Sequence, residues 1–121
     1  MSRTTDKPRQ NGLAVVRPTT DVVEREDGYY LYLNLPGVEK HAVEVESQGR
    51  DLVIDAVTSY GITKNERLHN LEFTDVRYQA RFTLMEDIER SGISAELRNG
   101  VLTVIMPRRP REPERISIKV T

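Results

Sequence analysis

The sequence predicts an all-β protein built as an antiparallel β-sandwich, with a short arm at each end. Val, Ile and Thr, the β-branched residues, number 13, 7 and 10 among the 121 residues, which favours pleated, half-buried strands. Apolar and polar side chains also alternate with a period of two in several segments. Turn residues separate these segments at short intervals, which is typical of a sandwich and not of a parallel sheet with crossover helices.

The first two predicted strands occupy residues 21–24 and 29–35. In the second of them, Leu31, Leu33 and Leu35 fall on one face while the intervening residues fall on the other. Pro36 and Gly37 follow directly and end the strand, because this pair favours a turn. We therefore expect the three leucines to face the core.

The next two predicted strands form a hairpin. Valines alternate with glutamates in residues 43–46, and residues 48–50 supply a turn. In residues 52–56 the first, third and fifth side chains are apolar and share a face. The hairpin thus presents one apolar face to the core.

The last three predicted strands cover residues 78–84, 93–98 and 101–106. Asn99 and Gly100 separate the final two and supply the positive-φ pair that a two-residue hairpin turn requires. Residues 85–90 are the one segment expected to form a helical turn.

Residues 58–75 do not fit this pattern, because their apolar side chains lack regular alternation. A structureless insert of this length is uncommon inside a compact domain. The segment is therefore expected to be functional or to be completed by another chain.

Charge divides the chain into three parts. Residues 1–18 sum to +3, residues 107–121 sum to +3, and the remaining residues 19–106 carry −7 within the net charge of −1. The two ends are also rich in Pro, Arg and other polar residues, so we expect flexible arms around an acidic sandwich. The longest apolar run near the N-terminus, Leu13–Val16, is too short for a signal peptide or a membrane span, which favours a cytoplasmic location.

The residues required for common catalytic and metal sites are missing. The chain has no Cys, and its two histidines, His41 and His69, form no zinc-binding motif. There is no nucleophile-elbow motif and no glycine-rich phosphate loop, so neither an enzyme nor a bound cofactor is expected.

Charged clusters are interpreted as solvated surface. Glu86 and Asp87 are adjacent carboxylates at a turn, and Glu44 and Glu46 share the polar face of a strand. The basic residues in 108–111 have no aromatic neighbours to stack on bases, and acidic residues follow them. This segment is interpreted as a solvated linker, and neither nucleic acid nor a membrane is expected as a partner.

A specific motif ends the predicted domain. It has the form A-x-L-x-N-G-V-L, and a Pro follows at residue 107. Its residues are Ala95, Leu97, Asn99, Gly100, Val101 and Leu102. Upstream, D-V-V-E at 21–24, Y-L at 30–31 and L-P-G-V at 35–38 occur in a matching order, and I-S-I follows at 116–118. Over residues 19–118 the chain resembles the small heat-shock protein (alpha-crystallin domain) family, in particular its bacterial and archaeal members.

This resemblance implies an immunoglobulin-like sandwich at 19–106 with an N-terminal arm at 1–18 and a C-terminal extension at 107–121. It implies an ATP-independent holding chaperone of the stress response, which binds unfolding proteins and prevents their aggregation. It also implies a homodimer that assembles into larger oligomers, and no enzymatic activity.

The resemblance also implies four groups of binding residues. The tail docking motif is Ile116 and Ile118. The docking groove comprises Val43, Val45, Ala95 and Leu97. The strand exchanged between dimer partners comprises Leu68, Leu71 and Phe73. The N-terminal client patch comprises Leu13, Val15 and Val16.

Three features depart from the family pattern. The first arm is short and has no Phe or Trp, and Ala80 stands where many members have an arginine. The linker at 108–115 has eight residues and spans at most about 30 Å when extended.

Alternative interpretations remain open at this point. Residues 116–120 are alternatively a further strand of their own domain. The domain is alternatively a co-chaperone or scaffold module that binds one folded partner, or, less in keeping with the residues present, a jelly-roll enzyme.

Overall fold

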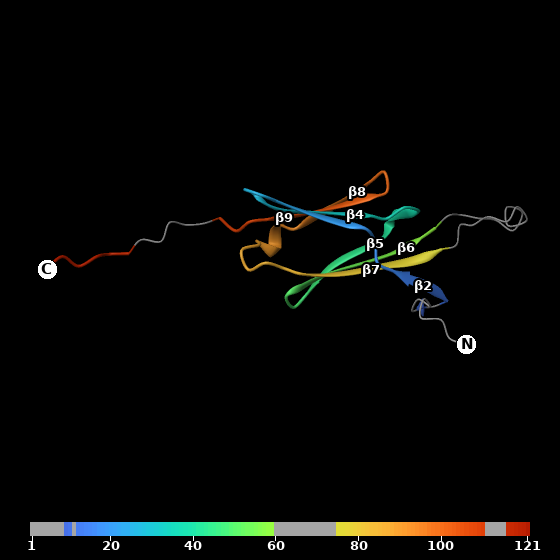
Figure 1. Ribbon diagram of the computed structural model, residues 1–121, viewed down its shortest axis with the longest axis horizontal. Helices are drawn as coiled ribbons and strands as arrows, with labels where there is room; N and C mark the ends of the chain where they lie inside the picture. Colours follow the sequence, from blue (N-terminus) through green and yellow to red (C-terminus); the bar gives the residue numbers. More distant parts are fainter. Residues whose placement is uncertain (1–8, 11, 60–74, 111–115) are drawn as a thin grey trace, which may run out of the picture.

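The computed structural model describes residues 9–10, 12–59, 75–110 and 116–121. The elements in this part of the chain are nine strands and one short 3-10 helix, η1 (Figure 1). Their bounds are β1 Arg9–Gln10, β2 Leu13–Val16, β3 Thr20–Arg25, β4 Gly28–Asn34, β5 Val38–Gln48, β6 Asp51–Thr58, β7 Val76–Thr83, η1 Arg90–Gly92, β8 Ser94–Arg98 and β9 Val101–Pro107.

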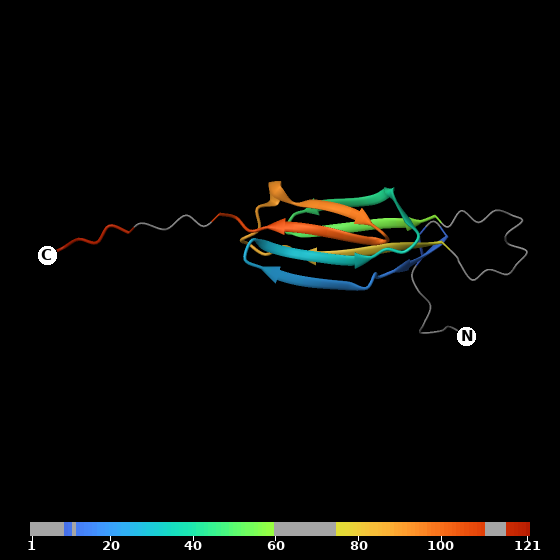
Figure 2. The same ribbon diagram turned by 90° about the horizontal axis from the view of Figure 1, so that it is seen from above.

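The strands form two stacked sheets, as the sequence predicts. One sheet has the order β1-β2-β7-β6-β5 and the other the order β3-β4-β9-β8. Figure 2 shows the second sheet face on, with β3 at one edge and β8 at the other. All neighbouring strands are antiparallel except β2 and β7, which are parallel.

The core lies between the sheets and follows the predicted alternation. Leu31, Leu33 and Leu35 are buried, which confirms the inward face of β4. From the other sheet, β6 contributes Leu52, Ile54 and Ala56. The remaining buried hydrophobic residues are Val38, Ala80, Leu84, Ile88, Leu102, Val104 and Met106. Each large side chain buried here contributes roughly 1.5–3 kcal/mol.

The two predicted hairpins are confirmed. β5 and β6 pair from Val43 opposite Ala56 to Gln48 opposite Asp51, although β5 begins earlier than expected, at Val38. β8 and β9 are joined at Asn99 and Gly100, whose φ angles are 50° and 78°. This positive-φ pair is the one that the tight turn requires.

The N-terminal segment Leu13–Val16 differs from the prediction. These four residues belong to the five-stranded sheet as β2 and are not part of a flexible arm. β2 pairs in parallel with β7, with Val15 opposite Arg77. The chain then passes Pro18 and enters the other sheet at β3. An apolar, β-branched run of this kind pairs with a sheet edge that would otherwise be open.

Within the predicted helical turn at 85–90, one turn forms in which Ile88 N–H donates to the Met85 carbonyl at 3.3 Å, and the 3-10 helix begins only at Arg90. The segment before it is held by Ile88, which is buried in the core and forms a β-bridge with Arg108. Residues 60–74, which include most of the predicted insert, lie outside the described residues.

Candidate binding surfaces

One candidate surface is a groove along the side of the sandwich where β5 and β8 form the edges of their sheets. Within the described residues each of these strands pairs on one side only, β5 with β6 and β8 with β9. A cavity of about 300 Å³ opens between them. It is lined by Val45, Glu46, Ser47, Leu52, Arg90, Ile93, Ser94 and Ala95. The groove therefore has an apolar floor and a polar rim.

The structure brings some of the predicted groove residues together. Val45 and Ala95 lie on opposite sides of the cavity and line it. Val43 and Leu97 are half-buried and pack against the core but are not part of the cavity lining. Ile93, which the sequence placed in the predicted strand 93–98 and which directly precedes β8 in the structure, also lines the groove.

Arg90 was not anticipated as a groove residue. It extends from η1 to the β5–β6 hairpin, where Nη1 donates to the Gly49 carbonyl and lies 3.5 Å from Ser47 Oγ. Since Arg90 and Ser47 both line the cavity, this contact joins η1 to the β5–β6 hairpin at one end of the groove. No sequence pattern indicates a partner 41 residues away along the chain.

The tail motif lies in the open. Ile116 and Ile118 are 72% and 81% exposed, and Val120 is 89% exposed. Residues 116–121 form no strand and lie away from the sandwich (Figure 1). In the described part of the chain the tail is therefore not a further strand of its own domain, which was one of the two interpretations left open.

The structure describes the predicted client patch but not the predicted exchanged strand. Leu13, Val15 and Val16 are half-buried in β2, so only part of their apolar surface is accessible. Leu68, Leu71 and Phe73 lie outside the described residues, and their role stays a prediction.

A second apolar hollow lies on the opposite side of the sandwich and was not predicted. Its volume is about 150 Å³. Val22, from the edge strand β3, and Met85, which follows β7, are 60% and 57% exposed beside it. Its lining also includes Tyr29, Leu31, Phe82, Thr83, Leu84, Ile88 and Met106.

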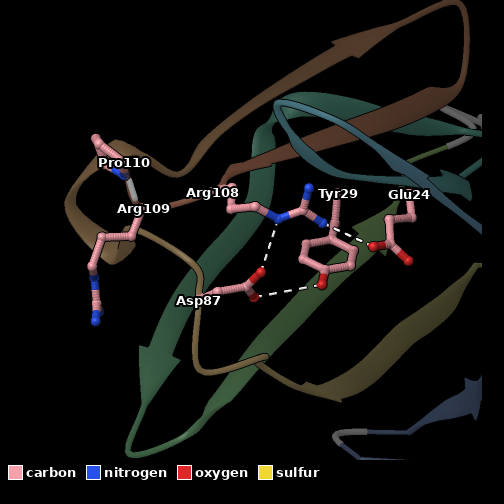
Figure 3. Close-up of a pocket in the computed structure, with 6 residues that line it drawn as sticks. All are labelled: Glu24, Tyr29, Asp87, Arg108, Arg109 and Pro110. Atoms are coloured by element: carbon pink, nitrogen blue, oxygen red, sulfur yellow. Dashed lines mark hydrogen bonds and ion pairs between the residues drawn. The ribbon is translucent and has the colours of Figure 1, made fainter. Parts of the chain in front are cut away.

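A polar cluster surrounds Arg108, at the point where the chain leaves β9 (Figure 3). Arg108 Nε donates to Asp87 Oδ2 at 2.8 Å, and Nη2 donates to Glu24 Oε2 at 2.9 Å. The Tyr29 hydroxyl lies 3.5 Å from Asp87 Oδ1, and the guanidinium stacks on the Tyr29 ring at 5.0 Å from its centre. Asp87 is thus shared between Arg108 and Tyr29.

Backbone carbonyls complete this cluster. Arg108 Nη1 donates to the carbonyls of Arg25 and Glu26 at 3.0 and 2.9 Å. The contact with the Tyr29 side chain, and after it the Asp87 carboxylate, raises the pKa of Arg108 above its ordinary value. The guanidinium therefore stays charged at any physiological pH.

These contacts correct the interpretation of two charged segments as solvated surface. The Arg108 side chain is 27% exposed and tethered, and Asp87 is its partner. The sequence interpretation failed because the two residues are 21 positions apart, and only the fold places the 85–89 segment beside the end of β9.

The described residues contain no group of His, Asp and Glu side chains that is suited to hold a metal ion. Among the same residues, no helix is long and apolar enough to cross a membrane.

Comparisons with known proteins agree with this architecture. A family model described as Hsp20/alpha crystallin family matches residues 21–121. A probable 15 kDa heat shock protein of Leptospira interrogans is 32% identical over 118 residues, which cover 98% of this chain and 90% of that protein. The 16.9 kDa class I heat shock protein 1 of Triticum aestivum is 32% identical over 111 residues, 89% of this chain and 74% of that protein.

Solved structures show the same fold. A small heat-shock protein of Xylella fastidiosa superposes with a TM-score of 0.69 at 27% identity, covering 85% of this chain and 96% of that one. HspA of Xanthomonas axonopodis gives a TM-score of 0.64 at 32% identity, covering 81% and 97%. The sandwich, the A-x-L-x-N-G-V-L hairpin and these matches agree, and the chain belongs to the Hsp20/alpha crystallin family of small heat shock proteins.

Proposed function

We propose that this small heat shock protein is an ATP-independent holding chaperone, which binds unfolding proteins through open apolar surfaces and prevents their aggregation. Family membership supports this function, and one observation carries the mechanism. The groove between β5 and β8 is open while the two isoleucines of the tail are exposed. A groove and a ligand of matching chemistry on one chain favour self-assembly.

The tail motif fits such a groove by its spacing. Side chains two residues apart point to the same side of an extended segment, so Ile116 and Ile118 would enter adjacent sites. Burying both contributes about 3–6 kcal/mol before the cost of ordering the tail. A link of this strength is reversible alone and becomes durable when several links act together.

The rest of the assembly follows the family pattern. Leu68, Leu71 and Phe73 would form a strand that pairs with the partner subunit, for which the open edge of β3 is suited. Release of a dimer from the oligomer would free the grooves and the patch at Leu13, Val15 and Val16 for unfolding clients. The protein would act in the cytoplasm, without nucleic acid, membrane or cofactor, and without catalysis.

A module that binds one folded partner is the weaker alternative. The relatives and structural neighbours are small heat shock proteins, which favours the chaperone function. An exposed isoleucine pair would also have no purpose in a monomeric module.

Holding activity is tested by light scattering. A thermolabile enzyme is heated without nucleotide, alone, with this protein, or with an equal mass of an unrelated soluble protein. We expect scattering to fall only with this protein, and to reach its minimum near one subunit per client chain. Equal scattering in all three samples at stoichiometric excess would reject the holding function.

Tail docking is tested by native mass spectrometry of Ile116→Gly/Ile118→Gly. The matched control is Ser117→Gly/Lys119→Gly, which adds the same backbone freedom but leaves both isoleucines. We expect the first variant to shift toward dimers and the control to keep the assembly of the unmodified chain. If both variants keep that assembly, the isoleucines do not link subunits.

A further inference from the structure

The root of the C-terminal extension, which is the point where the chain leaves β9 at Pro107, lies at the same end of the sandwich as the groove between β5 and β8. The ring of Pro107, the last residue of β9, lies so close to Gly92 of η1 that a Cβ at Gly92 would be 2.8 Å from its Cγ. Arg90, two residues earlier on η1, lines the groove. A linker that reaches about 30 Å is therefore long enough to return the tail to its own groove.

The Arg108 side chain points away from the groove. In the four-stranded sheet β9 lies between β4 and β8, and the groove is on the β8 side. All contacts of the guanidinium are instead with the β3–β4 hairpin and with Asp87. In the backbone, Arg108 N–H donates to the Asp27 carbonyl at 2.8 Å, and Arg109 N–H donates to the Asp87 carbonyl.

We propose that Arg108 is a positioning residue, which fixes the direction of the C-terminal extension away from its own groove and thereby favours docking on another subunit. This inference rests on the proposed docking of the tail. The Arg108 contacts hold the residue that follows β9 on the β4 side, so a return to the same subunit would require the chain after Arg108 to cross β9 toward β8.

The geometry distinguishes Arg108 from its neighbour. Its guanidinium uses Nε, Nη1 and Nη2 on four separate acceptors between 2.8 and 3.0 Å, which only the branched fork of arginine can reach together. The Arg109 side chain is 58% exposed, and it lies 3.4 Å from the Ile88 carbonyl and 3.9 Å from the Glu89 carboxylate. Arg109→Ala is therefore the matched control for Arg108→Ala.

Direction is measured by electron spin resonance distances. The chain has no Cys, so two introduced cysteines take spin labels without background. Pro110→Cys reports on the root of the extension, and Glu96→Cys reports on β8 beside the groove. Labelled subunits are diluted with unlabelled ones so that only distances within one subunit are measured.

The measurement is made first in the Ile116→Gly/Ile118→Gly background, which cannot dock through these side chains. We expect one narrow distance with Arg108 present, a broader distribution that extends to shorter distances in Arg108→Ala, and no change in Arg109→Ala. Superposition of the Arg108→Ala and parent distributions would overturn the proposal. This result does not depend on whether the tail docks, so it is separable from failure of the proposed function.

With the isoleucines restored, the same variants are compared by native mass spectrometry. We expect Arg108→Ala to lose large assemblies in favour of dimers, while Arg109→Ala keeps them. Arg108→Lys retains the charge but not the fork, and it covers the case in which Arg108→Ala does not fold. A lysine variant with the narrow distance and the assembly of the unmodified chain would also overturn the proposal.

Discussion

Gly28 tests the geometry at the root of the extension. It begins β4 opposite Pro107 and has a φ of +153°. A Cβ at this position would lie 2.3 Å from the Met106 carbonyl oxygen, 2.8 Å from Pro107 Cα and 3.0 Å from Arg108 N. All three are backbone atoms, so no side chain can rotate to relieve the contact. Gly28→Ala must displace either the end of β9 or the β3–β4 turn.

The cost follows from two contributions. Overpacking against fixed atoms costs about 1–3 kcal/mol, and the backbone conformation costs a further ~1–3 kcal/mol for any residue with a Cβ. Because the strain is partly relieved by movement of β9, we expect a loss of about 2–4 kcal/mol in the free energy of unfolding. At about 4–8 °C per kcal/mol, the Tm falls by roughly 8–32 °C.

Gly49→Ala is the matched control. Gly49 also has a positive φ, +61°, but an added Cβ meets no atom within 4 Å. Only the conformational penalty of about 1–2 kcal/mol then applies. Thermal unfolding is followed by circular dichroism at one subunit concentration, because assembly makes the Tm concentration-dependent. Equal Tm values for the two variants would refute the steric argument.

Two further predictions concern stability. Leu33 has no exposed surface, so Leu33→Ala should lower the free energy of unfolding by about 2–5 kcal/mol, measured from the urea midpoint, and a smaller loss would place this side chain outside the core. The hydrogen bond from Arg81, and after it that from Thr83, lowers the pKa of Asp51 below its ordinary value of 3.8. Asp51 therefore stabilises the fold above that pH, and the contribution is lost as the pH falls through the lowered pKa. The free energy of unfolding, measured with urea between pH 2 and 6, should fall less steeply with decreasing pH in Asp51→Asn than in the unmodified chain. An equal pH dependence in the two proteins would contradict this role of Asp51.

The strands were predictable because their signal is local. In β6, and in β4 from Leu31 onward, every second residue is buried, and the same alternation is visible in the sequence. The turn at Asn99 and Gly100 was predictable for a similar reason, since a positive φ at two consecutive positions restricts the residue types that fit.

What the sequence did not reveal depends on distant residues. The segment Leu13–Val16 has the composition of a strand, but only the open edge of β7 determines that it pairs there. Arg108 has the composition of a solvated linker residue, and its role is decided by acceptors on β3, on the β3–β4 turn and at Asp87. Charge alone does not distinguish a tethered arginine from a free one.

The groove was difficult to predict because its edge strand, β8, has only a weak burial pattern. Of the five residues of β8, four are exposed, because an edge strand covers the core on one flank only. Ala95 lines the groove with a small side chain, which leaves room that a larger residue would fill. In the proposed docking, Ile116 and Ile118, which are both exposed in this structure, would supply apolar side chains to this groove. Under the proposed docking, a preference for a second subunit would depend on the geometry at Arg108 more than on the chemistry of the groove, because the groove is the same in every copy of the chain.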